Sequence, residues 1–379
     1  MEVSGGGRSR AKDADRRRAY RVHAAIKPRQ CFCEIASAGR SETVRYAIIR
    51  SSRGDRRYGV DFADKDGTMK RDTLLFYSAF DDPAAWKRAL ETELPDLDVR
   101  IHPDIGDPEK VHYALVWRPP AGFFAGFRNL KLVTNLGAGI DSLVGRDDLP
   151  PVPISRLSDP GMVALMVSYV LFAVIRYARD IPIFEQAQRR REWRYVHPRA
   201  LSAIKVGVLG LGELGAPAAT ALAQAGFDVR GWARTPKTLP GVTCVSGRAA
   251  FDGFLADSEI LVVMLPLTPE TNELLGAREI ALLPKGAKLI NVSRGAVVDE
   301  AAMIEGLRSG QIGAATLDVF AVEPLPKDHV LWDMDNVLIT PHLASITVPE
   351  AAACDVAESI RRVRAGLMPL HRTDPARGY

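Results

Sequence analysis

The chain has 379 residues, of which 47% are hydrophobic and 25% are charged, which is typical of a globular protein and argues against disorder over most of its length. One hydrophobic core seldom extends over so many residues, so we expect two domains. The formal charge of the chain is +4. Residues 1–68 carry +7, from 16 Lys and Arg against 9 Asp and Glu, so the remainder carries −3. A slightly acidic remainder gives no reason to expect nucleic-acid binding.

Residues 1–68 differ from the rest of the chain in their scattered arginines and weak apolar periodicity. They allow three interpretations: a disordered basic tail, a transit peptide, or an upstream extension to a chain that naturally starts at Met69. The nine acidic residues argue against a transit peptide, and a clear strand soon after Met69 favours the third interpretation. No apolar stretch follows the first basic residues, so no signal peptide is expected.

The four cysteines are too few and too scattered for a disulfide framework, so a reducing, cytoplasmic location is expected. Cys31 and Cys33 have no second pair of ligands nearby, and two unrelated thiols explain them better than a metal site does. We therefore predict no bound metal.

An apolar strand over 73–78 opens the first regular segment, and a helix follows over 82–94 with Pro83 in its first turn. Further short apolar runs predict strands over 99–101, 113–117, 130–134 and 152–154. Strands that alternate with helical or loop segments predict a parallel α/β sheet.

The longest apolar run, 161–175, is shorter than the roughly 20 residues that a membrane span needs. It is apolar nearly all round, which is typical of a buried helix. We therefore predict a helix inside a protein core and no membrane association.

A second alternating segment follows this helix. Its helices are predicted over 214–225, ended by Gly226, over 300–309, begun by Asp299, and over 349–367. Its strands are predicted over 204–209, 229–233, 260–265, 289–292, 314–318 and 337–340. The fold class is therefore α/β, with two Rossmann-like or flavodoxin-like parallel-sheet domains.

The segment VGVLGLGELG places Gly210, Gly212 and Gly215 in G-x-G-x-x-G spacing between a predicted strand and a predicted helix. In that setting the first glycine permits a tight turn, the second lets a pyrophosphate approach the backbone, and the third allows close helix–strand packing. Glu213 and Leu214 belong to the same loop and are expected at the cofactor. The alternative is a glycine-rich turn that binds nothing.

The next strand ends in GWARTPKT, without the acidic residue that usually holds the ribose hydroxyls of NAD. Arg234 stands in that place, and Thr235 and Lys237 lie beside it. Arginine and lysine attract the 2′-phosphate of NADP, which a carboxylate would repel. The sequence therefore predicts a preference for NADP, with an ordinary exposed basic loop as the alternative.

Three further polar segments each come directly after a predicted strand, where α/β sheets bind ligands. They are NVSRG with Arg294, DVFAVEP with Asp318 and Glu323, and TPHLAS with His342. Arg294 suits the fork geometry of a carboxylate, and His342 suits proton donation to a carbonyl. Glu323 beside the imidazole would favour its charged form.

These segments resemble the D-isomer-specific 2-hydroxyacid dehydrogenase family, most closely its glyoxylate/hydroxypyruvate reductase A branch. The resemblance covers about 69–379, and the three separated segments that carry Arg294, Glu323 and His342 are its specific part. Supporting segments are ALVWRPP, NLGAGIDSL, LPLTPET, EPLP, TPHLASIT and the terminal ARGY.

The resemblance implies a role for each matching residue. Arg294 orients the substrate carboxylate and carbonyl, Glu323 partners the acid/base residue His342, and Asp318 lies near the nicotinamide carboxamide. The backbone N–H groups of Gly137, Ala138 and Gly139 bind the substrate carboxylate, and Trp117 caps the substrate pocket. Further cofactor contacts are implied for Leu265, Pro266, Thr268, Thr271, Val292 and Ser293.

The resemblance also implies that a cofactor domain, 166–345, is inserted into a substrate domain formed by 69–165 and 346–379, with the active-site cleft between them. It implies a homodimer built on the apolar helix after Gly161, although burial within one chain explains that helix equally well.

The implied reaction is the NADPH-dependent reduction of glyoxylate to glycolate and of hydroxypyruvate to D-glycerate, with His342 as the proton donor. Two alternatives stay open at this point. One is an NAD-linked dehydrogenase for another 2-hydroxy acid, and the other is a non-catalytic, nucleotide-sensing regulator of the same fold.

Overall fold

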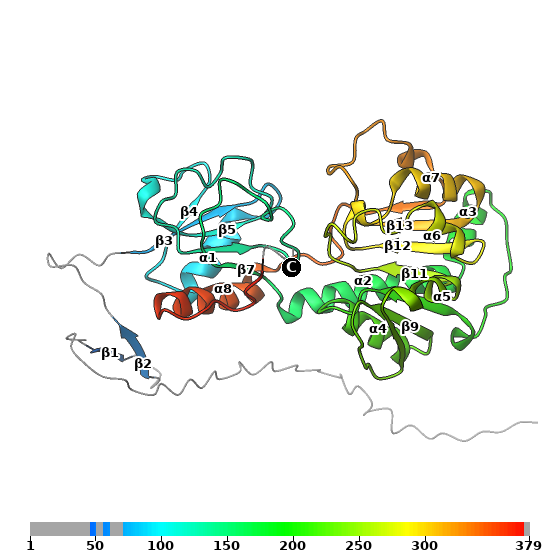
Figure 1. Cartoon of the computed structure of the whole chain (residues 1–379), viewed down its shortest axis with the longest axis horizontal. Coiled ribbons are helices and arrows are strands. Elements are labelled where there is room, and N and C mark those ends of the chain that lie inside the picture. Colours follow the sequence, from blue (N-terminus) through cyan, green and yellow to red (C-terminus); the bar gives the residue numbers. More distant parts are fainter. Residues whose placement is uncertain (1–45, 51–55, 61–70, 375–379) are drawn as a thin grey trace, which may run out of the picture. The chain divides into compact units, whose positions relative to one another are not determined.

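The computed structural model describes residues 46–50, 56–60 and 71–374 (Figure 1). Strands β1 (Tyr46–Arg50) and β2 (Arg56–Val60) pair antiparallel in a two-stranded sheet. The rest of residues 1–68 lies outside the described residues, so the three interpretations of this segment stay predictions.

A five-stranded parallel sheet, called the first sheet below, has the order β4-β3-β5-β6-β7. Helices α1 (Pro83–Glu93) and α8 (Pro349–Arg364) lie side by side on one face of it (Figure 1) and share a core with its strands. Asp82 begins α1 because its carboxylate accepts a hydrogen bond from the Ala84 N–H (2.9 Å). The strands are β3 (Thr73–Tyr77), β4 (Asp98–Ile101), β5 (Val111–Val116), β6 (Leu132–Asn135) and β7 (Ile154–Arg156).

The second sheet has seven parallel strands in the order β10-β9-β8-β11-β12-β13-β14. Strands β8 and β11 are neighbours although β9 and β10 come between them in the chain, so the strand order reverses there. Ligands of open α/β sheets bind beyond the strand ends at such a reversal, which is where the loop after β8 lies. The strands are β8 (Lys205–Leu209), β9 (Asp228–Ala233), β10 (Val242–Ser246), β11 (Ile260–Val263), β12 (Ala287–Asn291), β13 (Ile312–Leu317) and β14 (Val337–Ile339).

Helices cover both faces of the second sheet. Helices α2 (Pro160–Ala178) and α4 (Gly215–Gln224) contribute to the core on one face. Helices α5 (Phe251–Ala256), α6 (Ala277–Leu282) and α7 (Glu300–Ser309) contribute to the core on the other. This three-layer arrangement lets the strands be apolar on both sides.

Among the described residues, α2 is the one helix whose length and composition would allow it to cross a membrane, and 39% of its most apolar window is buried within the chain. Asp159 begins the helix by accepting hydrogen bonds from backbone N–H groups of its first turn. Buried side chains along α2 pack against α4, whereas Phe172 and Ile175 are 51% and 43% exposed. The predicted burial of this helix is therefore confirmed for one side only.

Every strand predicted from residue 73 onward is present within two residues of its predicted ends. The last helix ends at Arg364 rather than at 367, because Gly366 takes a positive φ and stops it. Strand β10 was not predicted, because its sequence VTCVS forms an edge strand of intermediate burial without a continuous apolar run. Helices α3 (Ile181–Arg189), α5 and α6 were also missed, because they are short.

Candidate active site

The loop between β8 and α4 is packed tightly at two glycines and open at the third. A Cβ on Gly210, whose φ is +111°, would lie 2.8 Å from the backbone of Met264. A Cβ on Gly215 would lie 1.9 Å from the Gly210 carbonyl oxygen, whereas one on Gly212 would meet no atom within 4 Å. The loop therefore needs glycine at its ends for its own packing and leaves space at Gly212 for a ligand.

The start of α4 suits an anion. The helix has ten residues, and Leu214 at its N-cap makes no side-chain capping hydrogen bond. Within the first turn, Ala216 N–H donates to the Gly212 carbonyl (3.0 Å) and Pro217 has no N–H, so the Gly215 N–H is the group left for a phosphate oxygen, which the helix dipole also favours. The geometry fits the pyrophosphate of a dinucleotide.

The turn after β9 carries the predicted basic group. Arg234, Thr235 and Lys237 are exposed there, away from the cavity described below. Glu270, from the loop after β11, lies close enough for Arg234 to contribute to a lowered pKa of its carboxyl, after the larger effect of a hydrogen bond from Thr268. An acidic residue therefore does lie near Arg234, but it comes from a distant part of the sequence.

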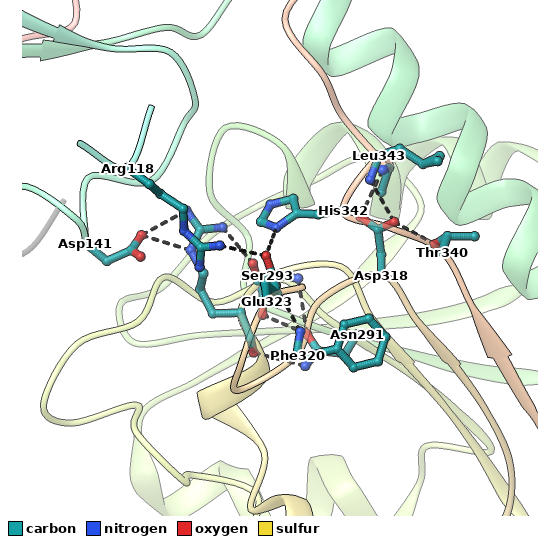
Figure 2. Close-up of polar contacts among 12 residues, drawn as sticks. Arg118, Asp141, Asn291, Ser293, Asp318, Phe320, Glu323, Thr340, His342 and Leu343 are labelled. Carbon is teal, nitrogen blue, oxygen red and sulfur yellow. Dashed lines mark hydrogen bonds and ion pairs between the residues drawn. The ribbon is translucent and has the colours of Figure 1, made fainter. Parts of the chain in front are cut away.

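His342 and Glu323 form a hydrogen-bonded pair, with Nδ1 2.8 Å from Oε2 (Figure 2). Glu323 Oε1 accepts a hydrogen bond from the Phe320 N–H (3.0 Å), and Arg118 Nη1 donates to the same Oε2 that His342 contacts (2.8 Å). Burial raises the pKa of Glu323, but these hydrogen bonds and the charges of His342 and Arg118 outweigh it and lower the pKa to about 2. Glu323 is therefore a carboxylate at any physiological pH.

Asp318 holds the segment that carries His342. Its carboxylate accepts hydrogen bonds from Thr340 Oγ1 (2.6 Å) and from the N–H groups of Leu343 and Ala344 (both 2.9 Å), and its carbonyl oxygen accepts one from the His342 N–H. Burial raises the pKa of Asp318 despite these bonds. The bonds fix a turn in which His342 has a φ of +55°, a conformation that non-glycine residues seldom adopt.

Arg294 is held from two sides. Its Nε and Nη2 both lie 2.9 Å from Asp141 Oδ1, and its Nη1 donates to the Ser293 carbonyl (2.7 Å). The guanidinium packs so closely on Gly139 that a Cβ there would lie 2.2 Å from Nη2. Asp141 lies between β6 and β7 of the first sheet, and Arg294 lies just after β12 of the second sheet. Their ion pair therefore joins the two sheets.

The turn after β6 is equally constrained. The Asn135 side-chain amide donates to the carbonyls of Gly137 (3.0 Å) and Gly139 (2.7 Å). A Cβ on Gly137 would lie 2.4 Å from the Trp117 ring, and that ring meets His342 edge-on with centroids 5.7 Å apart. Gly137 and Gly139 must be glycine, because the Trp117 ring lies directly on the backbone of the first and the Arg294 guanidinium on that of the second.

These groups surround a cavity of about 220 Å³, called the central cavity below. Residues of both sheets line it, so the separated motifs do meet. The predicted residues that line it are Trp117, Gly137, Ala138, Gly139, Gly212, Glu213, Leu214, Gly215, Leu265, Pro266, Val292, Ser293, Arg294, Asp318 and His342.

Some predicted residues do not line the central cavity. Gly210 packs against Met264, which itself lines the cavity, and Glu323 contacts His342 without lining the cavity. Thr271 does not reach it, because its hydroxyl donates to Pro266 O (2.6 Å) and accepts from Thr268 N (2.8 Å) within its own loop.

Three charged residues at this site were not predicted: Arg118, Asp141 and Arg156. Arg118 follows Trp117 in VWRPP, and Asp141 follows the glycine turn in GAGID, so both stand inside segments that the sequence already singled out. Arg156 Nη2 lies 3.0 Å from Glu213 Oε2 and thereby ties the end of β7 to the glycine loop. Sequence alone does not show which strand ends face one another across a cavity.

Comparison with known proteins agrees with this geometry. A family model described as the NAD-binding domain of D-isomer-specific 2-hydroxyacid dehydrogenases matches residues 171–344. Glyoxylate/hydroxypyruvate reductase A of Yersinia enterocolitica is 38% identical over 312 residues, which cover 81% of this chain and 99% of that protein. The chain belongs to the D-isomer-specific 2-hydroxyacid dehydrogenase family.

Solved structures place this dehydrogenase in the same family. A D-isomer-specific 2-hydroxyacid dehydrogenase from Xanthobacter autotrophicus, in complex with NADPH and MES, is 62% identical, with a TM-score of 0.78 over 82% of this chain and 100% of that one. An NADPH-dependent glyoxylate/hydroxypyruvate reductase from Sinorhizobium meliloti, in complex with NADP and sulfate, is 33% identical, with a TM-score of 0.77 and the same coverage. The predicted fold class and the resemblance to this family are confirmed.

Proposed function

We propose that this dehydrogenase reduces small 2-oxo acids with NADPH, converting glyoxylate to glycolate and hydroxypyruvate to D-glycerate. The observation that carries the proposal is the central cavity, where His342, Arg294 and the glycine loop meet. The Yersinia and Sinorhizobium relatives are both glyoxylate/hydroxypyruvate reductases, which supports the same substrates, and the Sinorhizobium enzyme is NADPH-dependent, which supports the same cofactor.

The residues present fit NADPH. The open space at Gly212 and the uncapped start of α4 suit the pyrophosphate, and Val292, Ser293 and Leu265 line the same cavity. Arg234, Thr235 and Lys237 are exposed on the neighbouring turn, where they would bind the 2′-phosphate. When bound, NADPH supplies the hydride.

Arg294 and the amides of the Gly137–Gly139 turn bind the substrate carboxylate. Asp141 occupies one side of the guanidinium, so Arg294 is already fixed in position before a substrate arrives. Fixing a charged donor in advance reduces the free energy lost when the substrate is oriented.

His342 donates the proton to the carbonyl oxygen. Because Glu323 engages Nδ1, the other ring nitrogen, Nε2, is the one available to the substrate. Glu323 orients the ring by accepting the hydrogen bond from Nδ1, and the neutral imidazole left after each turnover regains a proton from water. Arg118 donates to the same carboxylate oxygen and so helps to fix Glu323 in position.

The test is a steady-state assay of NADPH and NADH oxidation with glyoxylate, hydroxypyruvate, pyruvate and 3-phosphohydroxypyruvate. Rapid oxidation of NADPH with the first two acids is the expected result. Binding of NADPH without turnover of any 2-oxo acid would contradict the proposal and favour a nucleotide-sensing regulator.

We also propose that the enzyme is cytoplasmic, because the free thiols at Cys244 and Cys354 suit a reducing compartment.

The enzyme is further proposed to be a homodimer. Phe172 and Ile175 of α2 are exposed apolar side chains, and Trp193 and Tyr195, in the segment after α3, are 100% and 79% exposed, which favours a subunit contact. Sedimentation of Trp193→Asp against the unchanged chain tests this, and an unchanged mass would contradict a dimer that uses Trp193.

The proposed domain limits remain those given by the sequence: 69–165 with 346–379, and 166–345. Two observations support them. The described strands divide into two sheets at α2, and α8 packs on α1 of the first sheet.

A further inference from the structure

A second cavity, called the apolar cavity below, opens beside His342 and has a volume of about 370 Å³. It shares Trp117, Gly137, His342 and Ser345 with the central cavity, so the two adjoin at the proposed site of reduction. The carbonyl carbon of a 2-oxo acid held there carries its carboxylate on one side and its side chain on the other. With the carboxylate on Arg294, the apolar cavity is the space that remains for the side chain.

The lining of this cavity is predominantly hydrophobic. Four of its side chains are exposed large hydrophobics: Phe80 (70%), Trp332 (50%), Ile346 (52%) and Leu343 (44%). Contiguous exposed apolar groups at a cavity indicate a binding site for an apolar group. Water held against such a surface makes few hydrogen bonds, so an apolar substituent gains free energy by displacing it.

The charged groups of the apolar cavity already have partners within the protein. Arg118 and Glu323 are paired at 2.8 Å, and Asp81 Oδ2 accepts a hydrogen bond from Ser78 Oγ (2.5 Å). Asp81 and Glu323 are carboxylates, so they repel a second carboxylate or a phosphate on the substrate and offset the attraction of Arg118. The lining therefore disfavours dicarboxylic and phosphorylated 2-oxo acids.

We propose that the apolar cavity receives the substrate side chain, so that this enzyme also reduces 2-oxo monocarboxylic acids with a branched aliphatic or aromatic side chain. The inference rests on the proposed function, from which it takes the carboxylate anchor and the proton donor. Glyoxylate, which carries only a hydrogen at this position, leaves the cavity unfilled, and the single CH₂OH group of hydroxypyruvate fills little of it.

The first test compares kcat/KM with NADPH for pyruvate, 2-oxobutyrate, 4-methyl-2-oxopentanoate and phenylpyruvate, with glyoxylate as the reference. Burial of each added methylene favours binding by a factor of about three to four, so the third acid is expected to exceed pyruvate at least tenfold. A fall in kcat/KM along this series, with glyoxylate still reduced, would overturn the inference alone. Failure to reduce any of the acids would overturn the proposed function as well.

The second test uses Ile346→Asn, which puts an amide on the wall of the apolar cavity. The matched control is Leu367→Asn, a substitution at a similarly exposed residue (56%) that does not line the cavity. We expect Ile346→Asn to lower kcat/KM for 4-methyl-2-oxopentanoate about tenfold and to change that for glyoxylate less than twofold. Leu367→Asn is expected to change neither.

Two results of the second test would overturn the inference. An equal loss with both substrates would mean that Ile346 supports the fold of the site and does not contact the side chain. A change in sedimentation of Ile346→Asn would mean that a second copy of the chain covers these apolar residues.

Discussion

The glycine loop and the proton-donor site lie on the same cavity but are built in different ways. In the loop, Gly210 and Gly215 pack against each other within one short motif. In the proton-donor site, Arg118 from the end of β5 meets Glu323 and His342 from the second sheet. The shape of the glycine loop depends on its backbone conformation, whereas the geometry of the proton-donor site depends on contacts between charged side chains that are distant in sequence. Substitutions should therefore affect binding and stability in the first region and turnover in the second.

The largest effect is expected from His342→Ala. Loss of a positioned proton donor typically costs 10²- to 10⁴-fold, and we expect kcat with glyoxylate to fall about 10³-fold. The dissociation constant for NADPH should change less than about twofold, because the loop that binds the cofactor is untouched. Stopped-flow kinetics and a fluorescence titration with NADPH measure the two quantities.

A second histidine provides a matched control for this variant. His329 also pairs with a glutamate, with Nε2 3.1 Å from Glu300 Oε1, but neither residue lines the central cavity. His329→Ala should keep kcat within a few-fold of the unchanged enzyme. A loss of NADPH binding in His342→Ala would contradict the separation of the two regions.

The same contrast explains how much of the site could be predicted from the sequence. The motif of Gly210, Gly212 and Gly215 indicates dinucleotide binding by its spacing alone, and the strands around it are strongly apolar. Arg118 and Asp141 could not be predicted, because their partners, Glu323 and Arg294, lie far away in the chain. Their contacts depend on how the two sheets meet, and no local pattern encodes that.

The next effect, expected from Gly215→Ala, tests whether the loop depends on its backbone. The added Cβ would lie 1.9 Å from a carbonyl oxygen, and backbone cannot move aside as a flexible side chain can. We expect a loss of about 1–3 kcal/mol in the free energy of unfolding, together with weaker NADPH binding. Urea denaturation and a binding titration measure both.

Gly253 in α5 is the control for Gly215, because a Cβ there meets no atom within 4 Å. Gly253→Ala should stabilise the protein by up to about 1 kcal/mol, since alanine favours a helix more than glycine does. If both substitutions had the same effect, the close approach between Gly215 and Gly210 would not matter.

A comparable effect, on cofactor binding alone, is expected from Arg234→Ala, which tests the cofactor preference. Removing one charged partner of a phosphate costs about 1.5–3 kcal/mol, so NADPH should bind at least tenfold more weakly. NADH lacks the 2′-phosphate, so its affinity should change little. Parallel titrations with the two cofactors serve as each other's control, and equal losses would contradict the assignment of Arg234.

The smallest effect is expected from Arg118→Met, and it should appear in kcat. Arg118 Nη1 donates to Glu323 Oε2, the oxygen that also contacts His342, and so helps to fix the carboxylate that orients the imidazole. The hydrogen bonds from His342 and the Phe320 N–H remain in the variant, so the loss of one bond should lower kcat for glyoxylate about three- to tenfold, with little change in NADPH binding. Arg118→Lys should restore most of kcat. A parallel loss of NADPH binding would show that Arg118 acts only through the fold of its loop.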